Sequence, residues 1–119
     1  MVLVDTSVWV TYLRGGSRQL EELLMDAEVI CHPFIVGELA CGNLKNRTEI
    51  ITLLQSLPTA PTIDSDESLF FVEENRLTGR GIGFVDIHLL ASAQLADVKL
   101  WTADKKLRLA AEDLKVAYR

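Results

Sequence analysis

Short apolar runs alternate with longer amphipathic stretches along the whole chain. Runs such as "MVLV" and "EVIC" have the length and composition of buried strands. Between them, apolar residues recur with the period of a helix, as in "RQLEELLMDA", where the leucines and Ala27 share one face. This alternation predicts an α/β fold around a mainly parallel sheet. The expected strands are residues 1–4, 28–31 and 98–102, with shorter ones near 61–63 and 115–118.

Glycines and prolines separate the helical stretches and set their ends. Gly15 and Gly16 end the first helix, and Pro33 suits the first turn of the third. The segment "FVDIHLLASAQLA" is apolar on most of its surface, so a buried helix is expected there. The sequence has no repeats and no linker, which predicts a single domain over residues 1–119. The expected helices are residues 6–13, 18–27, 34–42, 47–57, 64–77, 84–96 and 104–114.

Composition narrows the class of protein. Hydrophobic residues make up 49% of the 119 positions, which is enough to build a core. No apolar run is long enough to cross a bilayer, and Asp5 interrupts the first one, so neither a membrane span nor a signal peptide is expected. Two cysteines indicate no disulfide framework and favour the cytoplasm. A zinc site is an alternative whose spacing matches no standard pattern; its ligands would be Cys31, His32, Cys41 and His88.

Four acidic residues are expected at one edge of the sheet. Asp5 follows the first strand and Asp104 follows the strand at 98–102. Glu38 lies within the helix that leaves the second strand, and Asp86 lies near the start of the buried helix. Ligands of parallel α/β sheets bind beyond the carboxyl ends of the strands, and helical side chains tilt back toward that edge. Each acid also has an ordinary interpretation, as a helix N-cap for the three aspartates and as a solvated helix residue for Glu38.

Carboxylates gathered in one pocket must share protons or hold a cation. Oxygen ligands without a converging histidine or cysteine favour Mg²⁺ or Mn²⁺ over zinc. Such a cation is typical of phosphoryl chemistry, because it activates water and offsets the charge of the attacked phosphate. The pattern therefore predicts a metal-dependent reaction on a phosphate ester.

The net charge of −5 argues against a polyanionic partner only if the acids are spread over the surface. Setting aside the four at the predicted pocket leaves 13 acids against 12 lysines and arginines, so RNA stays possible as a substrate. Basic residues follow two of the acids and are candidate phosphate contacts, or else solvated helix positions: Lys45, Arg47, Lys105, Lys106 and Arg108. No aromatic stacking platform is apparent, and Trp9 and Trp101 are expected in the core or a dimer interface.

Three segments together resemble the PIN domain, and within it the VapC-type ribonuclease toxins of toxin–antitoxin pairs: "VLVDTSVW", "GELACG" and "DIHLLASAQLADVKLWTADKKL". The resemblance covers essentially the whole chain. It implies a three-layer α/β/α fold, a homodimer, and a cognate antitoxin whose tail covers the active site. It also implies that Asp5, Glu38, Asp86 and Asp104 hold Mg²⁺ or Mn²⁺, with Thr6, Ser7 and Thr102 orienting the site. Some relatives carry a further acid where this chain has Lys106, which leaves one or two metal positions open.

The activity expected from this resemblance is hydrolysis of single-stranded RNA. Within nucleases, the alternative is a housekeeping PIN protein of RNA processing, and the short chain without an appended domain favours a toxin. Outside nucleases, a receiver domain would need paired acids where Thr6 and Ser7 follow Asp5. A haloacid-dehalogenase-type phosphatase would need a second aspartate at Ser7. A binding module that uses the acids only as helix caps is the non-enzymatic alternative.

Overall fold

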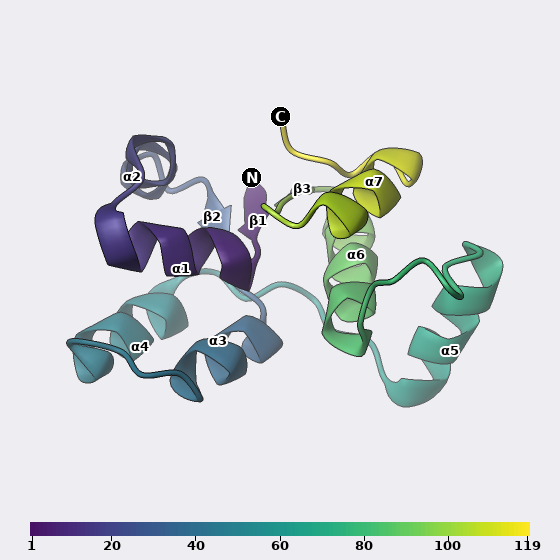
Figure 1. Ribbon diagram of the computed structural model, residues 1–119, viewed down its shortest axis with the longest axis horizontal. Helices are drawn as coiled ribbons and strands as arrows, with labels where there is room; N and C mark the ends of the chain where they lie inside the picture. Colours follow the sequence, from purple (N-terminus) through teal and green to yellow (C-terminus); the bar gives the residue numbers. More distant parts are fainter.

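The computed structural model describes residues 1–119, with a small parallel sheet at the centre (Figure 1). Its strands are β1 (Val2–Val4), β2 (Val29–Ile30) and β3 (Lys99–Trp101), in the order β2-β1-β3. Leu3 on the central strand pairs with Ile30 on one side and Leu100 on the other. All three residues of β1 are buried, as expected of a strand that is covered on both faces.

Seven helices surround the sheet. In Figure 1, helices α1–α4 lie on the left of the sheet and α5–α7 lie on the right, which confirms the expected three-layer α/β/α architecture. No helix is long and apolar enough to cross a membrane. The helices are α1 (Thr6–Gly15), α2 (Arg18–Met25), α3 (Pro33–Ala40), α4 (Arg47–Ser56), α5 (Ser65–Glu74), α6 (Phe84–Ala96) and α7 (Lys105–Asp113).

Two of the expected strands are reduced to single bridges. Cys31 pairs with Thr59, and Leu100 pairs with Ala117, each in parallel orientation. The expectation of a strand near 61–63 was therefore wrong in both place and length. Pro58 and Pro61 flank the bridge, and neither has the backbone N–H that a continued ladder requires.

Helix α6 passes through the interior, and every residue from Ile87 to Ala93 is buried. This confirms the expectation from its apolar sequence. Trp9 is fully buried in the same core, whereas Trp101 is partly exposed and packs on Tyr118 with ring centroids 5.3 Å apart. Burial of apolar side chains holds α1, α6 and the strands together. This packing fixes the position of the carboxyl edge of the sheet, where the acidic residues lie.

Candidate active site

Asp5 follows β1 directly and caps α1. One carboxylate oxygen, Oδ1, accepts a hydrogen bond from the Thr6 backbone N–H at 2.7 Å. The other, Oδ2, accepts from the hydroxyls of Ser7 at 2.9 Å and Thr102 at 2.7 Å. Only 7% of Asp5 is exposed, and these three donors offset the cost of burying its charge.

Ser7 and Thr102 connect the ends of β1 and β3. The Thr102 hydroxyl accepts from the Asp104 backbone N–H at 3.0 Å, in addition to donating to Asp5. The Ser7 hydroxyl accepts from the Ala103 N–H, also at 3.0 Å. Ser7 and Thr102, two of the three residues expected to orient the site, therefore contact Asp5 and the loop that carries Asp104.

Asp104 caps α7, as Asp5 caps α1. Its Oδ1 accepts from the backbone N–H groups of Lys106 at 2.8 Å and Leu107 at 3.1 Å. Its Oδ2 has no partner within the protein. The capping bonds therefore hold the carboxylate while leaving one oxygen free for a ligand.

Glu38 reaches the site from α3. Its Oε1 accepts from the Thr6 hydroxyl at 2.7 Å, although the two residues lie 32 positions apart. Glu38 is exposed, and its second oxygen has no partner within the protein. Thr6 thus fixes the long glutamate side chain beside the start of α1.

Asp86 lies in the first turn of α6, where its Oδ2 accepts from the Gly83 backbone N–H at 3.0 Å. Burial raises the pKa of its carboxyl group, and the negative charges of Asp5, Asp104 and Glu38 raise this pKa further. Repulsion of this kind acts over short distances, which agrees with the four carboxylates lying at the carboxyl edge of the sheet.

The N-cap interpretation holds for Asp5 and Asp104, whereas the N-cap of α6 is Gly83 and Asp86 is the third residue of that helix. Asp5, Asp86 and Asp104 bond to backbone N–H groups at the starts of α1, α6 and α7. These helix starts meet at the carboxyl edge of the sheet, and their partial positive charge favours carboxylates there. Hydrogen bonds from these N–H groups hold each aspartate in place, and the topology of the sheet brings the three helix starts to the same edge.

The donor set fits a hard divalent cation. Glu38, Asp86 and Asp104 each keep one carboxylate oxygen without a protein partner. No three acidic, histidine or cysteine side chains are drawn together as tightly as a metal-bound set.

The alternative zinc ligands are not gathered around one point. Cys31 is buried, and its burial raises the pKa of the thiol to about 11. Burial also lowers the pKa of His32 to about 4, with a smaller contribution from His88. Cys41 is exposed at the end of α3. The zinc interpretation therefore has no support in the structure.

A cleft of about 530 Å³ lies between α1, α3 and α4, and Glu38 is the one of the four acids that lines it. Thr6 and Glu38 line it together with Lys45, one of the expected phosphate contacts. Arg14 also lines it and was not identified from the sequence. The sequence could have indicated Arg14 through its spacing of eight residues from Thr6, since positions i, i+4 and i+8 of a helix share one face.

The other expected phosphate contacts do not line this cleft. Arg47, Lys105, Lys106 and Arg108 are exposed on the first turns of α4 and α7. The Lys106 ammonium lies over Gly81, in the loop before α6: a Cβ on that glycine would be 2.9 Å from Nζ. Lys106 is thus placed beside the loop that leads to Gly83 and Asp86.

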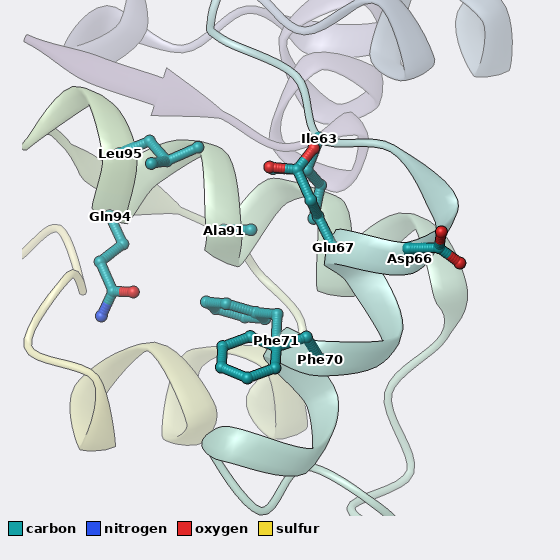
Figure 2. A pocket seen from close by; sticks show the side chains of 8 residues that line it. All are labelled: Ile63, Asp66, Glu67, Phe70, Phe71, Ala91, Gln94 and Leu95. Atoms are coloured by element: carbon teal, nitrogen blue, oxygen red, sulfur yellow. The ribbon is translucent and has the colours of Figure 1, made fainter.

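A second cavity, of about 420 Å³, lies apart from the acidic residues (Figure 2). It is formed by α5, α6 and the segment before α5, with Phe70 and Phe71 on one side and Ala91 and Leu95 on the other. None of the four site acids lines it. Its apolar lining suits a packing contact better than catalysis.

Comparison with known proteins agrees with this geometry. The family model described as "PIN domain" matches residues 2–113. Ribonuclease VapC32 of two Mycobacterium tuberculosis strains is 46% identical over 118 residues, covering 98% of this chain and 95% of that protein.

Two solved structures show the same fold at lower identity. The crystal structure of PAE2754 from Pyrobaculum aerophilum has a TM-score of 0.65 at 16% identity and covers 98% of this chain and 87% of its own. FitAB bound to an IR36 DNA fragment has a TM-score of 0.64 at 20% identity, covering 98% of this chain and 92% of the matched one. From the family match and the full-length similarity to VapC32, the chain belongs to the PIN-domain family and, within it, to the VapC group.

Proposed function

We propose that this chain is an endoribonuclease toxin that hydrolyses single-stranded RNA with a divalent cation, Mg²⁺ or Mn²⁺. One observation carries the proposal: Asp5, Glu38, Asp86 and Asp104 lie near one another at the carboxyl edge of the sheet in a chain 46% identical to Ribonuclease VapC32. Four carboxylates beside one another are suited to binding a cation rather than an anionic substrate directly. A bound cation would offset the negative charge of these carboxylates, so that a phosphate of the RNA could approach them.

The four acidic side chains would hold the cation, which supplies an activated water and offsets charge on the phosphate. The chain itself supplies rigid positions for these ligands. Thr6 holds Glu38, and Ser7 and Thr102 hold Asp5, so the carboxylates keep their places against mutual repulsion. Burial of Asp86 raises the pKa of its carboxyl group, so a bound cation would favour the charged form that burial opposes.

The histidines support hydrolysis by water instead of attack by the ribose 2′-hydroxyl. His32 and His88 are buried, and their free ring nitrogens are closed off from solvent. Neither imidazole is therefore placed to remove a proton from RNA. The expected products carry 5′-phosphate and 3′-hydroxyl ends.

The cleft beside Glu38 offers a path for the RNA backbone. Lys45 and Arg14 line it, and neither forms a salt bridge within the protein. Two cations in the cleft that Glu38 also lines would attract a polyanion in spite of the net charge of −5. Lys105, Lys106 and Arg47 are further contacts that an extended strand would reach.

As a toxin, the protein would act in the cytoplasm, be held inactive by a cognate antitoxin, and form a homodimer. The free thiols fit a reducing compartment. For the dimer, the support is an exposed apolar patch around the α5–α6 cavity, made of Leu69, Phe70 and Leu95. Burying these side chains against a second copy would remove their exposed apolar surface from water.

The decisive experiment is end-group analysis of single-stranded RNA incubated with the purified protein. Cleavage with Mg²⁺ or Mn²⁺ that leaves 5′-phosphates and stops in excess EDTA is the expected result. Cyclic 2′,3′-phosphate ends, or full activity in EDTA, would refute it. In cells, expression of the chain alone should arrest growth, and Asp5→Asn should relieve the arrest at equal protein level.

A further inference from the structure

A cluster of aromatic rings lies where the starts of α3 and α6 meet. The ring of His88 lies 4.7 Å from that of Phe34 and 4.5 Å from that of Phe84, measured between centroids, and both contacts are edge-to-face. His32 packs on Phe34 in the same way at 5.0 Å. Such contacts fix the orientation of each ring.

Two of these rings are buried and two are open to solvent. His32 and His88 are buried, whereas 38% of Phe34 and 60% of Phe84 is exposed. The imidazoles form no hydrogen bonds through three of their four ring nitrogens, so packing holds them in place. The result is a rigid support beneath two exposed phenyl rings.

Each exposed ring lies within one helical turn of an acidic residue on its own helix. Phe34 is one helical turn before Glu38 on α3. Phe84 follows Gly83, whose backbone N–H donates to the Asp86 carboxylate at 3.0 Å. Each phenyl ring is therefore tied by its own helix to one of the proposed cation ligands.

We propose that Phe34 and Phe84 form a stacking platform for one unpaired base of the RNA, next to the phosphate that is cleaved. The proposal rests on the ribonuclease function proposed above. Every base has a π-face that stacks on an aromatic ring, so this contact needs no particular sequence. It suits an acidic chain, because stacking adds affinity without adding positive charge.

The test measures kcat/KM for a short single-stranded RNA that the wild type cuts, under identical metal and salt conditions. Phe84→Leu and Phe34→Leu should each lower kcat/KM about 5- to 150-fold, the range expected for one lost base stack. Phe84→Trp should keep most of the activity because it keeps the ring. Met25→Ala is the control, since Met25 is exposed on α2, outside both the acidic edge and the apolar patch at the α5–α6 cavity, and the change should leave kcat/KM unchanged.

A set of RNAs with one abasic nucleotide at successive positions makes the test specific. At one position next to the cut, the abasic RNA should be a poor substrate for the wild type, and Phe84→Leu should cause no further loss. With the abasic nucleotide at any other position, Phe84→Leu should lower kcat/KM by the same factor as it does on the RNA that has all its bases.

Three results would overturn the platform. The first is a kcat/KM equal to that of the wild type in both Phe34→Leu and Phe84→Leu, when these variants are folded. The second is an equal loss from Phe84→Leu on every abasic RNA. The third is dissociation of an oligomer by Phe84→Leu with kcat/KM unchanged, which would make this face a protein contact. A wild type that cuts no RNA would instead refute the proposed function, and the platform with it.

Discussion

The hydroxyl of Thr102 donates to the buried carboxylate of Asp5 at 2.7 Å, across 97 positions of the chain. The same oxygen accepts from the Asp104 backbone N–H at 3.0 Å. One side chain thus connects the acid that follows β1 to the acid that follows β3. This contact positions two proposed cation ligands at once.

Replacing Thr102 with valine keeps the shape and removes both hydrogen bonds. A buried carboxylate and a backbone N–H would each lose a partner, so unfolding should become easier by about 1–3 kcal/mol. RNA cleavage should fall as well, because Asp5 and Asp104 are no longer held. Urea denaturation and cleavage assays would measure the two effects. Thr102→Ser should restore most of both, and Thr11→Val, at an exposed hydroxyl on α1, should change neither.

Asp86→Asn separates a cation ligand from a simple cap. Asparagine keeps an oxygen that can accept from the Gly83 N–H. It removes a negative charge that burial and the nearby carboxylates disfavour. The variant should therefore melt at or above the wild type in EDTA. It should gain little from Mg²⁺ or Mn²⁺, whereas a site at ~100 times its dissociation constant gains ~2.7 kcal/mol.

Thermal melts with chelator and across a metal titration would measure this. Asp64→Asn is the matched control, because Asp64 caps α5 in a capping box of its own and should leave the metal response unchanged. Equal destabilisation of Asp86→Asn with and without metal would show that Asp86 is only a cap.

His32 should make the protein less stable in mild acid. Burial lowers its folded-state pKa from 6.5 to about 4, so the unfolded chain binds the extra proton between these values. The stability contributed by the neutral imidazole is therefore complete above about pH 6.5 and is lost as pH falls toward 4. The loss should be on the order of 3 kcal/mol.

Denaturation curves at stepped pH would measure the slope. His32→Asn can still cap α3 and does not titrate, so its stability should depend less on pH over this range. A slope equal to that of the wild type would mean that His32 is not the group responsible.

Lys45→Ala should weaken RNA binding and leave folding intact, because Lys45 is exposed and lines the cleft beside Glu38. Loss of one phosphate contact should make the plot of the logarithm of the RNA association constant against the logarithm of the salt concentration less steep, by about 0.7 for a single strand. Binding titrations at several salt concentrations would show it. Arg18→Gln, at an exposed arginine on α2 whose only ion pair is with Glu22, should leave the slope as it is.

The sequence by itself determined the type of most elements and the identity of the acidic residues. Local pattern was sufficient there: the apolar run of α6 predicts a buried helix, and aspartates after apolar strands predict caps at the edge of a parallel sheet. The family followed from the resemblance of three segments, because the last of them, "DIHLLASAQLADVKLWTADKKL", spans both Asp86 and Asp104 at a fixed distance.

Only the tertiary structure decided how these residues meet. Phe34 and Phe84 stand 50 positions apart, so no local pattern reveals that His88 packs between them. Arg14 enters the cleft because α1 packs beside α3, and the strand expected near 61–63 shortens to one bridge beside its prolines. Side-chain packing and the pairing of distant segments depend on contacts between elements, and hydrophobic period alone carries no information about those contacts.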